Sequence, residues 1–204
     1  MNKNLIRRVA LVATAGAASL VLAACGSDDA SAGHDGSSSS APASATASQG
    51  QHNGADIAFA KGMIPHHRQA VEMADLAPSR AQSAEVKKLA GEIKKAQDPE
   101  IKTLSGWLTS WGEEVPAEDA MDHSMHDMDG MMAAEDMNSL KKASGKEFDT
   151  AFMEMMIKHH EGAVEMAKTE KADGTFPDAT KMADAIIISQ SAEISRMNSL
   201  LGKN

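Results

Sequence analysis

Hydrophobic positions between residues 55 and 203 recur at the spacing of amphipathic helices. In the first stretch they step by four, three, four and three residues, which places them on one helix face. These positions are Phe59, Met63, His66, Ala70 and Met73, and the same steps recur at Phe152, Met156, His159, Ala163 and Met166. A second stretch with the same rhythm follows each of them, at Ile93, Gln97, Glu100, Leu104, Trp107 and Trp111 and at Met182, Ile186, Gln190, Glu193, Met197 and Leu200. The pattern predicts four helices.

The two halves of this region are copies of one unit. Residues 56–108 align with residues 149–201 without a gap, at a constant offset of 93 residues. Identical positions, numbered in the first copy, include Asp56, Phe59, Met63, Ile64, His66, His67, Ala70, Val71, Glu72, Met73, Ala74, Lys88, Ala90, Ile93, Gln97, Glu100, Ile101 and Leu108. A constant offset across two predicted helices indicates a duplicated helical hairpin.

A single hairpin of this kind cannot bury its apolar stripe alone. We therefore expect the two hairpins to pair about a pseudo-twofold axis as an all-α four-helix bundle. Repeat 1 is assigned to residues 55–111, a connection to 112–145 and repeat 2 to 146–203.

Prolines predict where these helices end or bend. Pro78 and Pro177 are expected in the connections within the two hairpins, where helix breakers belong. Asp98 and Pro99 resemble a helix cap followed by a first-turn proline, which predicts a kink or a restart in the second helix. The fourth helix has no proline at the matching position and should be straighter.

The first 54 residues carry targeting information rather than a fold. Residues 1–24 combine a positive start with an apolar run from Val9 to Leu22, which is typical of a secretory signal. The run ends at Leu22-Ala-Ala-Cys25-Gly, which is similar to the lipobox of bacterial lipoproteins. The alternative, an uncleaved membrane helix, would need a longer apolar run. We predict lipidation at Cys25, a Ser/Ala/Gly tether over residues 25–54, and an exported protein anchored to the membrane.

Composition argues against several classes of partner and of chemistry. Without the three basic residues of the signal, 17 Lys and Arg (20 − 3) stand against 29 Asp and Glu, a formal charge of −12. This charge disfavours nucleic acid and anionic lipid surfaces. The absence of tyrosine and the presence of only two tryptophans disfavour a platform for stacking bases or sugars. The single cysteine excludes a disulfide within the chain and argues against a catalytic thiol.

Polar residues interrupt the predicted apolar stripes at matching positions. They are His66, Gln97 and Glu100 in repeat 1 and His159, Gln190 and Glu193 in repeat 2. Burying such groups costs free energy unless each finds a partner. Either each imidazole bonds a Glu or Gln on the neighbouring helix, or the layer holds a metal or ligand, and the residues alone favour neither. His67 and His160 lie beside the stripe and could be ligands, supporting groups or half-exposed boundary residues.

Methionine favours a soft metal ion. Met63 stands three residues before His66, and Met156 stands in the same way before His159, so a thioether and imidazoles share one helix face. Di-iron bundles use Glu-x-x-His at this spacing, whereas this chain has Met-x-x-His, which suits Cu(I) or Ag(I) better than iron. We expect Met73, Met166, Met182 and Met197 to be core fillers, and Glu72 and Glu165 to face solvent.

The connection between the repeats contains a second set of soft ligands. Six methionines fall between residues 121 and 137, in an acidic stretch without an apolar period. We select His123, Met125, His126 and Met128 as candidate ligands, because imidazoles and thioethers bind soft metals without a free thiol. The alternative is a low-complexity linker or a short amphipathic helix lying on the bundle.

With these motifs on duplicated helices behind an export signal, the chain resembles the domain of unknown function 305 (DUF305) family. The resemblance covers about residues 55–203 and rests on Met63-Ile64-x-His66-His67, on its copy at residues 156–160, and on the Gln-x-x-Glu-Ile patterns that begin at Gln97 and Gln190. It implies an exported bacterial protein with a ferritin-like bundle. The family has no settled general activity, and some of its members are linked to copper binding.

Three functions follow as hypotheses. The first is a lipid-anchored protein that sequesters or transfers copper or a related transition metal. The second is a non-enzymatic interaction module of the cell envelope, in which the buried polar layer is structural. The third is a ferritin-like oxidase, which the missing Glu-x-x-His pair and the absence of a phosphate loop, nucleophile elbow or HExxH motif argue against. Enzymatic activity is therefore disfavoured, and homo-oligomerisation is left open.

Overall fold

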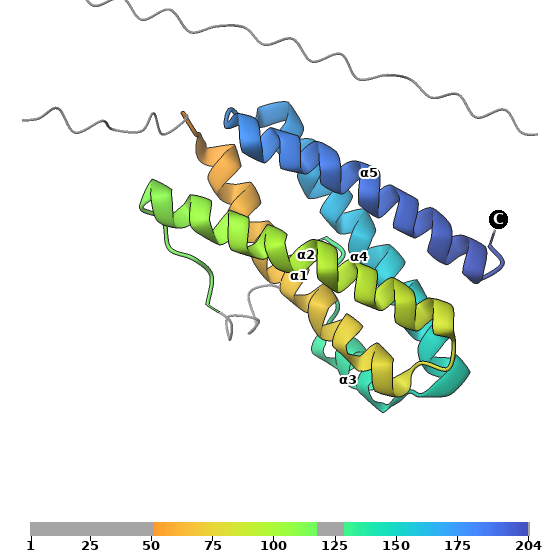
Figure 1. The fold of residues 1–204 in the computed structure, drawn as a ribbon. Coiled ribbons are helices and arrows are strands. Elements are labelled where there is room, and N and C mark those ends of the chain that lie inside the picture. The colour runs from red at the N-terminus through yellow and green to blue at the C-terminus, as the bar shows by residue number, and fades with distance from the viewer. Residues whose placement is uncertain (1–50, 118–128, 204) are drawn as a thin grey trace, which may run out of the picture. The chain divides into compact units, whose positions relative to one another are not determined.

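The structure is a computed structural model that describes residues 51–117 and 129–203. This part is all-helical, as predicted, and is drawn in Figure 1. Its helices are α1 (Gly54–Arg80), α2 (Ala84–Trp111), α3 (Ala134–Lys142), α4 (Gly145–Asp173) and α5 (Pro177–Leu200). The predicted signal, Cys25, the tether up to residue 50 and the candidate ligands His123, Met125, His126 and Met128 lie outside the described residues. None of the described helices is long and apolar enough to cross a membrane.

Two hairpins pack through one central contact. In repeat 1, α2 packs against α1, and in repeat 2, α5 packs against α4. The hairpins meet where α1 packs against α4, whereas the described parts of α2 and α5 approach each other less closely and are joined by ion pairs from Arg196. In Figure 1, α2 lies over α1 and α5 lies over α4. The α1–α4 contact is therefore the place where residues of both repeats can form one site.

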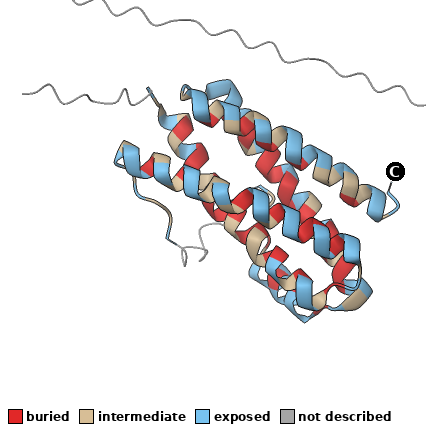
Figure 2. Ribbon diagram, in the orientation of Figure 1, coloured by how far each residue is buried: buried red, intermediate tan, exposed pale blue. Residues whose placement is uncertain are grey.

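The predicted stripes are buried. In Figure 2 the buried residues, in red, lie where the helices face one another. Phe59, Met63 and Met73 on α1 and Phe152 and Met156 on α4 are at most 5% exposed. The core forms two apolar clusters, one on each side of the histidines. On α1 one cluster ends at Ile64 and the other begins at Ala70, so a polar layer separates them. Towards the ends of α2 and α5 the stripe is less covered: Met182, Trp107 and Trp111 are half-buried and Leu200 is exposed, and Met166 on α4 is also half-buried.

The prediction for Pro78 is wrong, and the restart predicted at Pro99 does not occur. Pro78 lies inside α1 rather than in the connection, because the helix continues to Arg80 and the Ala81 N–H still donates to the Ala77 carbonyl at 2.9 Å. α2 runs without a restart through the exposed Pro99, because Ile93 and Leu104 are buried on the same face on either side of it. Pro177 starts α5 as expected, at a position whose missing N–H costs no helical hydrogen bond.

Matching aspartates hold the turn of the opposite hairpin. Asp56 at the start of α1 accepts hydrogen bonds from the backbone N–H groups of Thr175 (3.1 Å) and Phe176 (2.9 Å), in the α4–α5 connection. Asp149, its counterpart on α4, accepts from the N–H groups of Gln82 (3.0 Å) and Ser83 (2.9 Å), in the α1–α2 connection. The four donors and two acceptors obey the same 93-residue offset. The pseudo-twofold symmetry of the sequence is thus present in the fold.

Helix α3, in the connection between the repeats, is additional to the four predicted helices. α3 buries Met137 and Leu140 against one of the apolar clusters, and its Lys141 pairs with Glu72 on α1 at 2.7 Å. For residues 134–142, the alternative of a short amphipathic helix on the bundle is what the structure shows. Glu72 was expected to be solvated and is instead half-buried in this ion pair, whereas Glu165 is exposed.

Candidate metal centre

Four histidines lie buried in the polar layer between the two apolar clusters. His66 and His67 on α1 and His159 and His160 on α4 all have no exposed surface. Consecutive residues on a helix point about 100° apart, so the two members of each pair face different neighbours. His66 and His159 face each other across the α1–α4 contact, with ring centroids 3.8 Å apart and planes tilted by 43°.

The second histidine of each pair bonds a glutamate of its own hairpin. His67 Nε2 lies 2.8 Å from Glu100 Oε2 on α2, and His160 Nε2 lies 2.6 Å from Glu193 Oε2 on α5. Half-exposed positions for His67 and His160 are excluded, because the packed second helix covers each ring completely. Mutual satisfaction of the polar layer is therefore correct for His67 and His160, with Glu100 and Glu193 as their partners.

The same explanation is wrong for His66 and His159. Neither nitrogen of either ring has a hydrogen-bond partner among the described residues. The Nδ1 atoms of His67 and His160 and the Oε1 atoms of Gln97 and Gln190 are also buried without one. Each such group costs about 1–3 kcal/mol of folding free energy. Eight buried polar atoms without a hydrogen-bond partner are far more than a well-packed core retains. A bound ion or ligand would supply the partner that these atoms lack.

Burial keeps the facing histidines neutral. It lowers the pKa of His66 to about 3, and nearby His67 and His160 lower it further, while the backbone of Asp129 beside the ring opposes the shift. Burial likewise lowers the pKa of His159 well below its usual value, with further lowering from His66 and His160. A neutral imidazole has a free lone pair, which is the form that binds a metal ion.

Two thioethers complete the donor set near the histidines. Met63 and Met156 lie one helical turn before His66 and His159 and are fully buried. No group of three or more His, Cys, Asp or Glu side chains in residues 51–117 and 129–203 is arranged to hold a metal ion. The donors that the sequence predicts beside the His66–His159 pair are imidazole and thioether groups. This donor set fits a soft monovalent ion and does not fit a di-iron centre.

The described ends of the connection are attached beside the same histidines. Arg68, next to His67, donates from Nη1 to the carbonyls of Pro116 (2.7 Å) and Ala117 (3.0 Å). Gln69 exchanges two buried hydrogen bonds with the backbone of Met132. Sequence reasoning missed Arg68 and Gln69, because neither recurs in repeat 2. The two copies differ at most positions, so this difference gave no usable signal.

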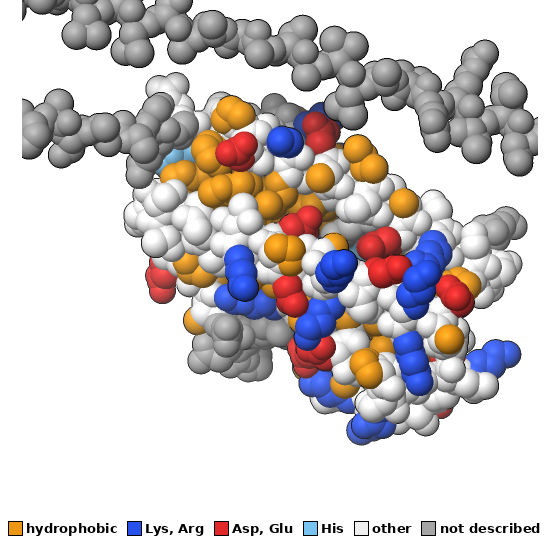
Figure 3. All heavy atoms as spheres, in the orientation of Figure 1, with side chains coloured by type: hydrophobic (Ala, Val, Ile, Leu, Met, Phe, Trp, Pro, Cys, Tyr) orange, Lys and Arg blue, Asp and Glu red, His pale blue; other side chains and the backbone are white. Residues whose placement is uncertain are grey.

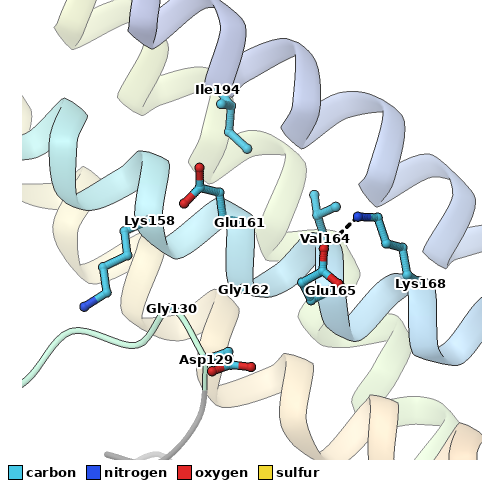
Figure 4. Close-up of a pocket in the computed structure, with 9 residues that line it drawn as sticks. All are labelled: Asp129, Gly130, Lys158, Glu161, Gly162, Val164, Glu165, Lys168 and Ile194. Carbon is cyan, nitrogen blue, oxygen red and sulfur yellow. Dashed lines mark hydrogen bonds and ion pairs between the residues drawn. The ribbon is translucent and has the colours of Figure 1, made fainter.

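A surface pocket of about 490 Å³ adjoins this attachment, between α4 and α5 (Figure 4). Asp129 and Gly130 lie against Gly162 on one side of it, and a Glu165–Lys168 ion pair of 2.6 Å lies on another. The four histidines are not among the residues that line it. The pocket is therefore a neighbour of the buried layer and not part of it.

A second surface feature lies at the end of the bundle where α2 ends and α5 begins. Trp107 and Trp111 pack edge-on against Phe176, each with ring centroids 5.3 Å apart, and His52 stacks on Trp111 at 4.5 Å. Figure 3 shows apolar side chains gathered over this end. This cluster contains no metal-ligating pair, so the histidine layer is the better candidate centre.

Comparison with known proteins agrees with this arrangement. Residues 56–201 match the family model described as Domain of unknown function (DUF305). The chain belongs to the DUF305 family. A DUF305 protein from Streptomyces coelicolor, assigned as secreted, is 32% identical, with a TM-score of 0.66 over 73% of this chain and 91% of its own. Among curated proteins, none matches this DUF305 chain.

Two further solved structures are of a protein called CopM. Its Cu(II)-bound form is 39% identical to this DUF305 chain, with a TM-score of 0.63 over 71% of this chain and 94% of its own. Its Cu(I)-bound form is 37% identical, with a TM-score of 0.60 and the same coverage. CopM has also been crystallised with silver. A similar protein with this fold has thus been crystallised with copper and with silver.

Proposed function

We propose that this protein is an exported, lipid-anchored copper-binding protein that sequesters or transfers Cu(I). The observation that carries the proposal is the His66–His159 pair: two fully buried imidazoles, 3.8 Å apart, with no hydrogen-bond partner on any ring nitrogen. The unsatisfied nitrogens are explained if they turn towards an ion on the pseudo-twofold axis. Similarity to CopM, which binds Cu(I), Cu(II) and silver, supports copper as the ion.

The remaining residues of the layer have supporting roles in this proposal. Met63 and Met156 supply thioether sulfur, which prefers Cu(I) and Ag(I) and needs no deprotonation. Glu100 and Glu193 fix the rings of His67 and His160 through Nε2, which leaves Nδ1 free to accept or to ligate. Gln97 and Gln190 each direct an unpaired buried oxygen into the same layer. The two repeats thus contribute equal halves of one site.

The connection adds a second binding element in this proposal. His123, Met125, His126 and Met128 are soft ligands that lie outside the described residues. They would collect the ion near the two attachment points at Arg68 and Gln69. Replacing these four residues with serine, with residues 129–203 unchanged, separates their contribution from that of the bundle.

Titration of the mature chain with Cu(I) under reducing conditions tests the proposal. A His66→Leu/His159→Leu double variant should lose the tight bundle site, and the four-serine variant should lose only the additional binding. The comparison variant is His67→Leu/His160→Leu: retained Cu(I) uptake would confine the bundle site to His66 and His159, and lost uptake would extend it to all four histidines. The proposal fails if neither the wild-type chain nor the four-serine variant takes up Cu(I) or Ag(I).

Stability without metal separates this function from the second candidate, a structural interaction module. The His67–Glu100 and His160–Glu193 bonds favour a structural role for those four residues. His66 and His159 have no partner to lose, so replacing both with leucine should leave stability unchanged or raise it by about 1 kcal/mol. Urea unfolding of the metal-free protein measures this. A loss of stability would instead assign the pair to a structural network.

The location is part of the proposal and has its own test. Cys25 is the predicted lipidation site at the end of the signal. Cys25→Ser should move the protein from the membrane fraction to the soluble extracytoplasmic fraction, because a tether without lipid has no anchor. Recovery of the variant in the membrane fraction would show that another element holds it there.

A further inference from the structure

One short segment of the connection lies across the contact between the two repeats. This segment, Asp129–Met132, is called the strap below. At its start, the Asp129 backbone lies beside the His66 ring. The next residue, Gly130, packs against the backbone of α4 at His159 and Gly162. At its end, Met132 is joined to Gln69 on α1, so the strap passes from one central helix to the other beside the facing histidines.

The contact with α4 requires glycine on both sides. A Cβ on Gly162 would lie 2.0 Å from the Asp129 carbonyl oxygen, far inside any real contact. A Cβ on Gly130 would lie 2.8 Å from the Lys158 carbonyl oxygen, and its φ of 84° is one that other residues rarely adopt. Both clashes are with backbone, which cannot rotate away. The strap can therefore lie on α4 only where a side chain is missing.

On α1 the strap is held by a side chain, that of Gln69, whereas on α4 it packs against the helix backbone. Gln69 Nε2 donates to the Met132 carbonyl at 2.9 Å, and the Met132 N–H donates to Gln69 Oε1 at 2.7 Å. Both bonds are buried, with Gln69 5% and Met132 4% exposed. A primary amide carries its donor and its acceptor on two separate atoms, so it can pair with the N–H and the C=O of one backbone residue at the same time.

Gln69 and Gly162 occupy the same position of the duplicated unit, because they are 93 residues apart. At this repeat position α1 has a glutamine that hydrogen-bonds the strap, and α4 has a glycine that leaves room for it. His66 and His159, three residues earlier on each helix, remain identical. The strap thus contacts α1 and α4 through two residues that each lie three positions after one of the facing histidines.

We infer that the strap seals the His66–His159 pair from solvent and that Gln69 and Gly162 are the positioning residues that seat it. The inference rests on the proposed function in one respect: an ion that reaches the pair must displace the strap, so these two residues set the rate of exchange. The competing entrance lies between α2 and α5, where Glu100 and Glu193 are partly exposed, with 23% and 21% of their side chains accessible.

The test uses the metal-free mature chain, with diethylpyrocarbonate as the probe of imidazole access. Gln69→Leu removes both strap hydrogen bonds at similar size, and Gly162→Ala lifts the strap from the other helix. In each variant, modification of His66 and His159 should rise on the order of tenfold, together with hydrogen exchange at the Met132 amide. The two variants act on different helices, so a folding defect in one leaves the other as the test.

Matched controls keep the result specific. Gly91→Ala adds the same methyl group on α2, where nothing lies within 4 Å. Glu72→Gln, one turn after Gln69, releases only the α3 ion pair with Lys141. Neither should change the labelling of the pair. The inference is overturned if these controls expose the pair as much as the two strap variants do, or if Met132 exchanges faster while the imidazoles stay protected.

Silver exchange adds the functional readout. Transfer of bound Ag(I) to a competing chelator should be on the order of tenfold faster in Gln69→Leu and Gly162→Ala than in the wild-type chain. Unchanged transfer rates with exposed imidazoles would place the entrance between α2 and α5 and overturn the role in exchange. A chain that binds no silver but shows the expected labelling would refute the proposed function while leaving the seal intact.

Discussion

Repeat 1 and repeat 2 place the same residues around the pseudo-twofold axis and different residues away from it. His67–Glu100 and His160–Glu193 bond at 2.8 and 2.6 Å in the same geometry, and His66 faces His159 between them. Away from the axis, Ala77 of repeat 1 corresponds to Glu170 of repeat 2, and Trp107 corresponds to Leu200. A duplicated unit thus keeps symmetry where both copies meet and loses it where each copy meets a different neighbour.

The largest difference we expect between equivalent positions is at the two aspartates. Asp56 holds the α4–α5 turn and also accepts from its own cap residue Asn53 at 2.6 Å, whereas Asp149 holds only the opposite turn. Asp56→Ala should cost about 4 kcal/mol of unfolding free energy and Asp149→Ala about 2 kcal/mol, because each leaves buried N–H donors without acceptors. Urea unfolding of both variants measures the comparison. Equal losses would show that the cap adds nothing to the turn contacts.

The next effect concerns Glu170, which replaces an alanine of repeat 1. Burial raises its pKa to about 8, and the neighbouring Asp56 carboxylate contributes to the same shift. For Asp56, burial alone would raise the pKa, but hydrogen bonds from the Phe176 and Asn53 backbone outweigh it and lower the pKa. Glu170 therefore keeps its proton at neutral pH, whereas Asp56 is ionised.

This shift has a definite sign for stability. The unfolded chain ionises Glu170 from about pH 4.5 upwards, whereas the folded chain retains the proton until about pH 8, so stability falls across that window and then levels. Glu170→Gln should remove the decline and be about 2–3 kcal/mol more stable than the wild type at pH 8.5, with little difference at pH 4.5. Unfolding at the two pH values measures it. Exposed Glu165→Gln on the same helix is the control and should follow the wild type.

A smaller effect is expected where an aromatic cluster of repeat 1 has no counterpart. Trp107 packs edge-on against Phe176 and near Trp111, while the equivalent Leu200 is 41% exposed. Trp107→Ala should cost about 2 kcal/mol, because the ring is half-buried, and Leu200→Ala should stay within about 0.5 kcal/mol. Thermal unfolding of both variants tests the difference. Similar losses would mean that the exposed leucine is covered in solution.

The smallest effect lies in the surface ion pairs that join Arg196 of repeat 2 to repeat 1. Arg196 on α5 bonds Glu92 at 2.6 Å and Glu85 at 3.1 Å on α2, and the equivalent residue of repeat 1 is Thr103. Arg196→Ala should cost at most about 1 kcal/mol, and the loss should disappear at 1 M salt. A salt-independent loss would indicate that Arg196 acts through packing of its aliphatic stem rather than through charge.

Much of this fold was predictable from the spacing of residues. The 93-residue offset and the four-three steps gave the helices, the hairpins and the buried layer, because helical periodicity and duplication depend on local sequence alone. The burial of Met63, His66, Gln97 and their copies followed from the same stripe. The prolines misled, because burial of Ile93 and Leu104 on both sides of Pro99 outweighs a local preference to interrupt α2.

The partners within the candidate site were not predictable in the same way. Spacing put His66 on the stripe and His67 beside it, but which of them bonds Glu100 depends on the side from which α2 packs against α1. The strap contacts of Gln69 and Gly162 depend on where a distant segment crosses the helices. Such contacts leave no period in the sequence, and a difference between two repeats that differ at most positions does not reveal them either.

The reciprocal hold of Asp56 and Asp149 has a consequence for the origin of this architecture. Each repeat supplies the acceptor that closes its partner's turn, and each supplies one of the two facing imidazoles. The same contacts would form between two separate copies of a single hairpin, as an isologous homodimer with one shared site on its exact twofold axis. Fusion into one chain would then have allowed the two halves to diverge, while the facing histidines on the pseudo-twofold axis stayed identical.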